Sequence, residues 1–276
     1  MRAMWSLHPR FLGEKPLEVA VVGVGGTGSE IVSNLIHLHL GLVALGHGGI
    51  HVVAFDPDNV AAANVVRQRY CAADIGRNKA EVLIGRCNLA SALEWDAMPS
   101  RFTSSYARRA WDLVISCVDT RKSRQQLHKY AFEDRLTGGW YFWLDAGNTA
   151  TSGQVILGTP RSERRATLHM LPCATELHPE LMDVSIADDD GPSCSALEAL
   201  QRQDLMVNKM VAVLAVDMLW RLFRDKQISA HARYFDLARS SVAERAVPTR
   251  SPRRSTKERI GARQLDCRSG ACGSLA

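Results

Sequence analysis

The sequence lacks the cysteine pattern of a disulfide-rich protein and that of a zinc site. Its seven cysteines are odd in number and scattered, and no two of them form a Cys-x-x-Cys pair. A secreted disulfide scaffold carries a denser and even-numbered set. We therefore expect a reducing, cytoplasmic environment and no structural zinc.

Long hydrophobic runs are also missing. The N-terminal residues include no apolar segment of the length found in signal peptides. The most apolar late stretch, 207–223, contains Lys209, Asp217 and Arg221, and it is too short to cross a bilayer. This stretch predicts a buried helix, and we expect no membrane partner.

No compositional bias marks the chain as fibrous or wholly disordered. Hydrophobic residues make up 46% and charged residues 23% of its 276 residues. These values exclude collagen-like and coiled-coil proteins, and the length suffices for one large domain with a sizeable core. No internal repeat is visible.

Neither sign of charge dominates the body of the protein, although the formal net charge is +5. Residues 239–276 hold nine Lys or Arg and three Asp or Glu, a charge of +6, so the rest of the chain sums to −1. The segment is also poor in large apolar residues. We expect 237–276 to be a basic, disordered tail, and nucleic-acid binding only through it.

Strand-like and helix-like patterns alternate along most of the remaining chain. The predicted strands are 19–23, 50–56, 113–119, 140–147 and 153–158, with a weaker one at 101–106. The predicted helices are 29–40, 78–93, 121–136 and 207–223. The alternation predicts right-handed crossovers in a Rossmann-like α/β fold, a mostly parallel sheet flanked by helices. This domain would span 18–236, after a short N-terminal lead, 1–17.

A glycine-rich loop follows the first predicted strand. Gly23, Gly25 and Gly28 fit the pattern G-x-G-x-x-G, and Gly26 adds a fourth glycine. Such a loop lets backbone N–H groups approach phosphate oxygens at the start of a helix. Asp56 ends the second strand, where a carboxylate can accept hydrogen bonds from ribose hydroxyls. Together these residues predict a nucleotide but no particular reaction.

The residues after the second strand favour ATP over a dinucleotide. Arg67 and Lys79 would place two cations near the phosphate loop, and Asn64 precedes them. Fixed cations suit a polyphosphate because they neutralise the charge that builds up when phosphorus is attacked. Asp119 ends the third strand, and a carboxylate there suits Mg²⁺ bridging phosphate oxygens. An NAD(P) oxidoreductase and a nucleotide-binding scaffold without turnover remain as alternatives.

Several motifs in order carry a family resemblance. They are GVGGTGS, FDPDNV, N-x-x-R-Q, D-x-G-x-x-K-A and the strand-end Asp119. The sequence resembles the ThiF/MoeB/ubiquitin-activating enzyme (E1-like) superfamily, and within it the ThiF-related proteins of the PRTRC plasmid cassette. The resemblance implies a ThiF-type adenylation domain that works as a homodimer. It also implies ATP-dependent adenylation of the C-terminal carboxylate of a small ubiquitin-like or sulfur-carrier-like protein.

The resemblance assigns roles to the residues of the nucleotide site. Asp56 would hold the ribose, and Asn64, Arg67 and Lys79 would contact the triphosphate. Arg124 matches an arginine of the same family segment.

Asp119 would bind Mg²⁺ in this scheme, although a threonine follows it where relatives have an asparagine. A carboxylate substrate is already ionised at neutral pH, so its attack on phosphorus needs no general base. No Ser/His/Asp arrangement is readable in the sequence, and this chemistry requires none.

Cys194 lies where some relatives place a cysteine before a crossover helix. It could accept the activated carboxyl as a thioester or take part in sulfur transfer. The alternative is a small packed thiol without a chemical role. The nearby acidic run 188–190 could bind a metal or a basic partner, or form a solvated loop.

Overall fold

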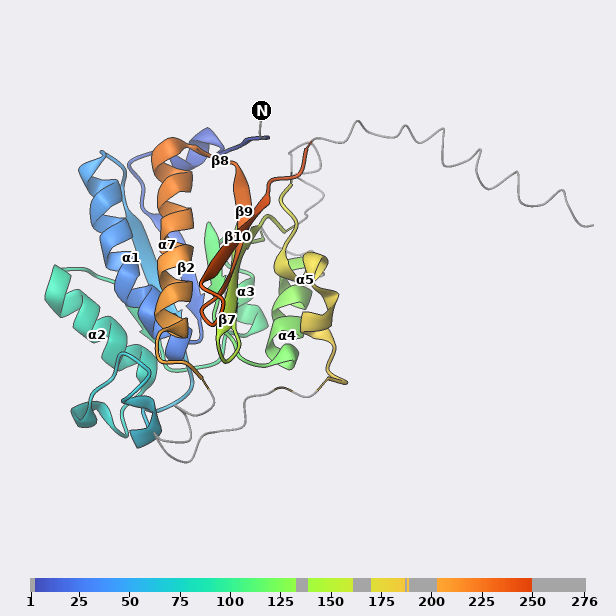
Figure 1. The fold of residues 1–276 in the computed structure, drawn as a ribbon. Coiled ribbons are helices and arrows are strands. Elements are labelled where there is room, and N and C mark those ends of the chain that lie inside the picture. Colours follow the sequence, from blue (N-terminus) through green and yellow to red (C-terminus); the bar gives the residue numbers. More distant parts are fainter. Residues whose placement is uncertain (1–2, 133–138, 161–169, 187, 189–202, 250–276) are drawn as a thin grey trace, which may run out of the picture.

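The computed structural model describes residues 3–132, 139–160, 170–186, 188 and 203–249. Eight strands form one sheet in the order β10-β9-β7-β6-β5-β2-β3-β4. Figure 1 shows this sheet between helices. The strands are β2 (Leu17–Val22), β3 (Ile50–Phe55), β4 (Asp96–Met98), β5 (Leu113–Ser116), β6 (Phe142–Asn148), β7 (Ser152–Gly158), β9 (Ala230–Asp236) and β10 (Ser241–Ala246). A separate pair is formed by β1 (Trp5–Ser6) and β8 (Gln227–Ile228).

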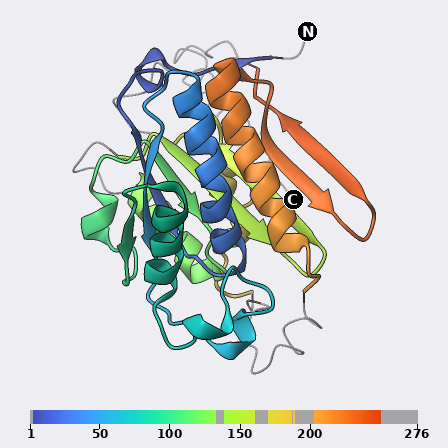
Figure 2. The ribbon, with the colours of Figure 1, turned by 90° about the vertical axis from the view of Figure 1, so that its left-hand side faces the viewer.

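Helices flank both faces of this sheet. The α-helices are α1 (Gly26–Ala44), α2 (Lys79–Ser91), α3 (Ser104–Ala107), α4 (Arg121–Phe132), α5 (Ala174–Leu177) and α7 (Val207–Asp225). Short 3-10 helices are η1 (Pro9–Phe11), η2 (Ala62–Asn64), η3 (Ala72–Asp74) and η5 (Pro179–Met182). In Figure 2, α1 and α7 lie side by side in front of the sheet, and α2 lies beyond α1.

The sheet has a parallel half and an antiparallel half. Neighbours from β4 through β3, β2 and β5 to β6 run parallel. From β6 outward, β7, β9 and β10 pair antiparallel. The chain builds outward from β2 to β3 and β4 before it crosses to β5 on the other side of β2. The order of strands reverses between β2 and β5, and in open α/β sheets ligands usually bind at the carboxyl ends of the strands at such a point.

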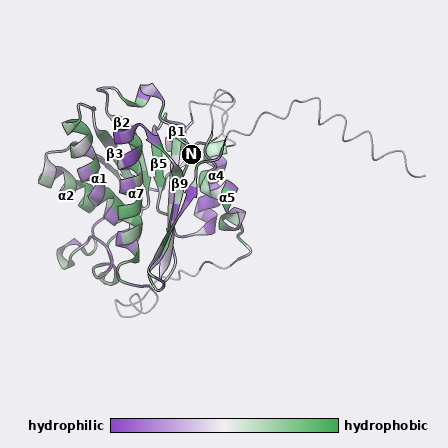
Figure 3. Cartoon of the chain, turned by 45° about the horizontal axis from the view of Figure 1, so that its top comes forward, coloured by the Kyte–Doolittle hydropathy of each residue, from purple (hydrophilic) through white to green (hydrophobic). Residues whose placement is uncertain are grey.

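The central strands are apolar on both faces because both faces are covered. In β2, Val19 and Val21 belong to the core cluster under α1 and α7, whereas Ala20 and Val22 belong to the cluster on the opposite face. A strand that is buried on both faces has a continuous run of apolar residues in its sequence, and the segment 19–23 has such a run. Figure 3 shows hydrophobic colour in these strands and more hydrophilic colour along β9. The prediction of a mostly parallel α/β sheet flanked by helices is confirmed.

The weak strand expected at 101–106 is wrong. The edge strand is β4, and the helical turn α3 follows it. Phe102 and Tyr106 are four residues apart and both pack edge-on against Phe55, with ring centroids 4.9 Å away in each case. Spacing of four places side chains on one side of a helical turn, so these aromatics favour a turn over an extended strand.

The expectation of a tail without structure from residue 237 is wrong for Ser241–Ala246. These residues form β10, which pairs with β9 across a turn where Ser240 has a positive φ of 49°. All six side chains are classed as exposed, so the apolar signal that marks a strand in a sequence is missing. Val247 is buried directly after β10, and its amide donates to the Ser229 carbonyl at 2.9 Å. Residues 250–276 lie outside the described part.

Candidate nucleotide site

The glycine loop between β2 and α1 has two positions at which a side chain would collide with backbone. Gly23 has a φ of +86°, and a Cβ there would lie 2.9 Å from the carbonyl oxygen of Cys117 at the end of β5. A Cβ on Gly28 would collide with the Gly23 carbonyl oxygen. Glycine at these positions therefore lets the first turn of α1 pack directly onto β2 and β5.

The other two glycines face different surroundings. A Cβ on Gly26 would lie 2.7 Å from the Nδ2 atom of Asn208 on α7. A Cβ on Gly25 would meet no atom within 4 Å, and Gly25 caps the N-terminus of α1. The first amides of a helix have no intrahelical acceptor, so a backbone that is open at Gly25 offers a place for an anion.

Asp56 lies beside this loop, as its position after the second predicted strand suggested. Its carboxylate accepts hydrogen bonds from the Val24 amide at 2.7 Å and the Asp58 amide at 2.9 Å. Burial raises the pKa of Asp56 above 3.8, although both amides and the Lys79 charge act in the opposite direction. The carboxylate thus fixes the loop to β3, and its contact with ribose stays a prediction.

Lys79 is held at the start of α2 by its neighbour Asn78. The Asn78 side chain caps the helix, accepting from the Ala80 amide at 2.9 Å, and it donates to the carbonyls of Asp56 and Asp58. Lys79 is largely buried, and its Nζ lies 3.3 Å from a carboxylate oxygen of the exposed Asp58. The Lys79 charge is therefore directed toward the carboxyl end of β3.

The segment that carries Asn64 and Arg67 is attached to the glycine loop. The Tyr70 hydroxyl donates to the Val24 carbonyl at 2.7 Å, and the Arg69 amide donates to the Ser29 hydroxyl at 3.2 Å. Asn64 closes a local turn by accepting from the Ala61 amide at 2.9 Å. The structure therefore brings Arg67 to the first turn of α1.

Arg67 itself is a half-buried cation without an acidic partner. It donates from a terminal nitrogen to the Gln203 Oε1 atom at 2.7 Å. Its Nε is buried and has no hydrogen-bond partner within the described part of the chain. Among the described residues Arg67 takes part in no ion pair. It costs free energy to bury an N–H donor without an acceptor and a cation without a counter-charge. A bound anion would supply both the acceptor and the counter-charge.

Arg124 has different surroundings from the other predicted site residues. It is buried on α4, and its Nε lies 3.3 Å from Asp145 Oδ2 in the middle of β6. The Ser116 hydroxyl donates to the same Asp145 oxygen at 2.7 Å. The other Asp145 oxygen is buried, and no described residue forms a hydrogen bond with it. Arg124 thus neutralises a buried carboxylate between β5 and β6.

Asp119 lies in the loop between β5 and α4, and it is exposed. Within the described part of the chain, no three His, Cys, Asp or Glu side chains gather closely enough to hold a metal ion. Mg²⁺ is commonly held by one or two carboxylates together with substrate phosphates, so Asp119 could supply one ligand, and its binding of Mg²⁺ stays a prediction. Cys194 lies outside the described residues. Of the acidic run 188–190, only Asp188 is described, and it accepts from a terminal nitrogen of Arg121 at 2.8 Å.

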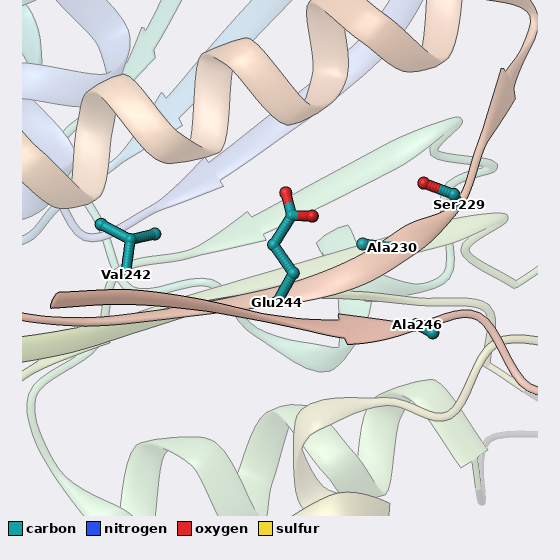
Figure 4. Close-up of a pocket in the computed structure, with 5 residues that line it drawn as sticks. All are labelled: Ser229, Ala230, Val242, Glu244 and Ala246. Atoms are coloured by element: carbon teal, nitrogen blue, oxygen red, sulfur yellow. The ribbon is translucent and has the colours of Figure 1, made fainter. Parts of the chain in front are cut away.

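Sequence reasoning missed several polar residues that build this site. Asn78 had a readable signal, because an asparagine directly before a predicted helix is a common N-cap. Tyr70, Gln203 and Asn208 had none, because they come from distant parts of the chain and only the fold brings them to the loop. A shallow hollow lined by Ser229, Ala230, Val242, Glu244 and Ala246 lies on the β9–β10 face and includes no predicted site residue (Figure 4).

A comparison with protein families matches the ThiF family over residues 15–257. The chain belongs to the ThiF family. The match begins within the expected N-terminal lead and continues through β10. The E1-like resemblance inferred from the motifs is therefore confirmed at the level of the ThiF family.

Two curated ThiF-related proteins resemble part of the chain. The ubiquitin-like modifier-activating enzyme 5 of Arabidopsis thaliana is 27% identical over 168 residues, which cover 53% of this chain and 36% of that protein. The tRNA threonylcarbamoyladenosine dehydratase of Haemophilus influenzae is 27% identical over 124 residues, 43% of this chain and 44% of that protein. The matched regions span less than half the length of both relatives.

Solved structures share the fold at low sequence identity. Escherichia coli MccB superposes with a TM-score of 0.59 and 15% identity, covering 87% of this chain and 64% of that one. PaaA gives a TM-score of 0.56 and 15% identity, covering 84% and 64%. These likenesses support the ThiF-type fold alone. Across the described residues, no helix is long and apolar enough to cross a membrane.

Proposed function

We propose that this ThiF-family chain uses ATP to adenylate the C-terminal carboxylate of a small ubiquitin-like or sulfur-carrier-like protein. The observation that carries the proposal is Arg67, a half-buried cation linked to the first turn of α1 through Gln203 and Asn208, whose buried Nε has no partner among the residues that the structure describes. A dinucleotide site has no evident need for such a cation, whereas a triphosphate supplies the anion that Arg67 lacks.

The remaining site residues would contact different parts of the nucleotide. Asp56 would accept from the ribose, and the open backbone at Gly25 would approach the phosphates. Asn64 and Lys79 would complete the phosphate contacts. Arg124 would act by holding Asp145, because its guanidinium is already engaged in that buried pair.

The reaction requires positioning more than acid–base chemistry. A carboxylate oxygen of the partner attacks the α-phosphorus, and the bond from that phosphorus to the bridging oxygen breaks. The products are the acyl-adenylate and pyrophosphate. Arg67 and Lys79 would stabilise the negative charge that moves onto the leaving pyrophosphate. A magnesium ion held by Asp119 would supply further neutralisation of the phosphates.

The partner and the assembly are inferred from relatives. One curated relative is named a ubiquitin-like modifier-activating enzyme, and E. coli MccB has been solved together with AMPCPP and MccA. We accordingly propose a protein or peptide carboxylate as the acceptor of AMP and a homodimer as the working unit. A PRTRC association, a cytoplasmic location and a thioester on Cys194 belong to the same proposal.

Pyrophosphate exchange into ATP tests the proposal. We expect exchange that depends on a ubiquitin-like partner with a free C-terminal carboxylate. Arg67→Ala should weaken ATP binding about 10- to 100-fold, since hydrogen bonds to charged groups contribute about 1.5–3 kcal/mol. Arg239→Ala is the matched control, because that side chain is 83% exposed on the far antiparallel half of the sheet.

Three outcomes would contradict parts of this proposal. ATP binding without exchange for any candidate partner would favour a nucleotide-binding scaffold. Binding of NAD(P) in preference to ATP would favour an oxidoreductase. Exchange that survives Asp119→Ala unchanged would show that the magnesium assignment is wrong.

A further inference from the structure

Arg67 is connected to α7 through two side-chain amides. Gln203 Oε1 accepts from Arg67 at 2.7 Å and from Asn208 Nδ2 at 3.1 Å. Gln203 Nε2 donates to the Thr149 carbonyl at 3.2 Å. An amide oxygen has two lone pairs, and both have donors here, so the orientation of the Gln203 amide is determined by its partners.

Asn208 connects this chain of hydrogen bonds to α1 and β6. It is 3% exposed in the first turn of α7. Its Oδ1 accepts from the Thr27 hydroxyl at 2.9 Å and from Asn148 Nδ2 at 2.6 Å. Thr27 belongs to the first turn of α1 and Asn148 ends β6. These hydrogen bonds therefore fix the position of the Arg67 guanidinium relative to the first turn of α1, the turn that would receive the phosphates.

The chemistry of the acceptor matters as much as its position. A carboxylate at position 203 would pair with Arg67 and cancel its charge before any nucleotide arrives. The neutral amide orients the guanidinium and leaves its positive charge available. The buried Arg67 Nε, which has no partner among the described residues, shows that this hydrogen bonding does not satisfy the cation completely.

We propose that Gln203 and Asn208 are positioning residues that hold the Arg67 guanidinium at the glycine loop without neutralising it. The inference rests on the proposed function, because it takes the phosphates of ATP as the anion. Gln203 acts through Arg67, and Asn208 acts through Gln203. Neither residue has to touch the nucleotide.

Binding of ATP and of adenosine, measured side by side by calorimetry, tests the inference. Gln203→Leu removes the acceptor and should weaken ATP binding about three- to tenfold, the usual range for one hydrogen bond. Gln203→Glu should weaken ATP binding by more than tenfold, because it pairs with Arg67 and repels phosphate. Adenosine lacks phosphates, so both variants should bind it like the unaltered protein. Its retained affinity also shows that the site is folded.

Two controls separate positioning from general effects. Gln227→Glu makes the same change of charge beyond the opposite end of α7 and should alter neither affinity. In an Arg67→Ala background, Gln203→Leu should cause no further loss of ATP affinity, because the residue through which it acts is gone. An additive loss in that double variant would overturn the proposal, as would equal losses for ATP and adenosine or no loss at all.

The same titrations distinguish this inference from the proposed function. If the unaltered protein binds ATP but supports no pyrophosphate exchange, adenylation is refuted while the ratio of ATP to adenosine affinity still decides the positioning role. If the unaltered protein does not bind ATP, both proposals are refuted together. If exchange occurs and the Gln203 variants keep full ATP affinity, only the positioning role is refuted.

Discussion

At the residue scale, the four glycines of the loop differ in what surrounds them. Gly23 and Gly28 are required by backbone that lies too close for a side chain, and Gly26 is crowded by the Asn208 amide. Gly25 faces open space. The motif G-x-G-x-x-G therefore combines a packing requirement with a place for a ligand to approach the backbone. Substituting alanine at one glycine of each kind distinguishes the two roles.

Gly28→Ala and Gly25→Ala form a matched pair. Gly28→Ala forces a methyl group into the Gly23 carbonyl and should lower the free energy of unfolding by about 1–3 kcal/mol, as overpacking does. Gly25→Ala should cost less than about 1 kcal/mol, the scale of a helix-cap change. It should nevertheless weaken ATP binding by placing a methyl group where phosphate approaches. Urea unfolding and ATP titration measure the two effects, and equal destabilisation by both substitutions would contradict this division.

His231 gives the protein a pH-dependent stability. Its side chain is fully buried on β9, with Nδ1 3.1 Å from the Leu157 carbonyl oxygen and with no hydrogen-bond partner for Nε2 among the described residues. Burial lowers its pKa below 6.5, so the folded protein keeps it neutral. Below that pH the unfolded chain takes up a proton that the folded chain resists. The free energy of unfolding should then fall by up to about 1.4 kcal/mol per pH unit.

Urea unfolding from pH 7.5 to 5 checks this prediction. His231→Phe should show a flatter dependence of unfolding free energy on pH than the unaltered protein. His37→Phe, a change at an exposed position on α1, serves as the control and should keep the original slope. An unchanged slope in His231→Phe would show that another group causes the acid sensitivity.

At the element scale, ion pairs join the β9–β10 ribbon to α7 in addition to apolar packing. Arg233 on β9 donates to Asp217 of α7 at 2.6 Å, and its Nε lies 3.2 Å from Glu244 of β10. Figure 4 shows Val242 and Glu244 on the same side of β10, toward α7. The Arg233 side chain is only 10% exposed, so loss of its partners would leave a poorly solvated cation.

Truncation at two positions tests whether β10 belongs to the folded body. A chain ending at Thr249 keeps β10 and the buried Val247, and its melting temperature should equal that of the full chain. A chain ending at Arg239 loses Glu244, Val247 and the β10 ladder and should melt several degrees lower, since about 1 kcal/mol shifts a domain of this size by about 2–4 °C. Equal melting temperatures for the two truncations would show that β10 contributes no stability.

At the scale of the whole molecule, the site lies where three separate stretches of chain meet. The glycine loop comes from residues 23–28, the cations from 64–79, and the amides that hold Arg67 from 203–208. They converge because β2 and β5 are neighbours at the reversal of strand order, and α7 packs beside α1. A ligand that binds only this assembled site should stabilise the entire fold, because the site exists only when the three stretches are packed together.

Thermal unfolding with different nucleotides measures this coupling. At a concentration 100 times its dissociation constant, ATP should add about 2.7 kcal/mol to the free energy of unfolding and raise the melting temperature. The same concentration of NAD should have a smaller effect, because it lacks the triphosphate that the proposed function assigns to Arg67. A larger stabilisation by NAD than by ATP would contradict the assignment of the site.

The local parts of this site could be read from the sequence because each depends on neighbouring residues. Apolar runs at 19–23 and 50–56 became β2 and β3, and the glycines, Asp56 and Lys79 lie at their carboxyl ends. The prediction that failed, a tail without structure at Ser241–Ala246, also depended on a local pattern. Six exposed residues of β10 carry no apolar pattern, so nothing in that segment predicted a strand.

The sequence by itself determined the ThiF-type α/β fold and most of the residues around its glycine loop, since periodicity and motif spacing are properties of short segments. Only the tertiary structure decided which partners those residues contact. It paired Arg124 with Asp145 and left Arg67 without an acid among the described residues. It also brought Gln203 to Arg67 from 136 positions away. Partners at that separation are selected by the packing of α7 against α1, which no local pattern encodes.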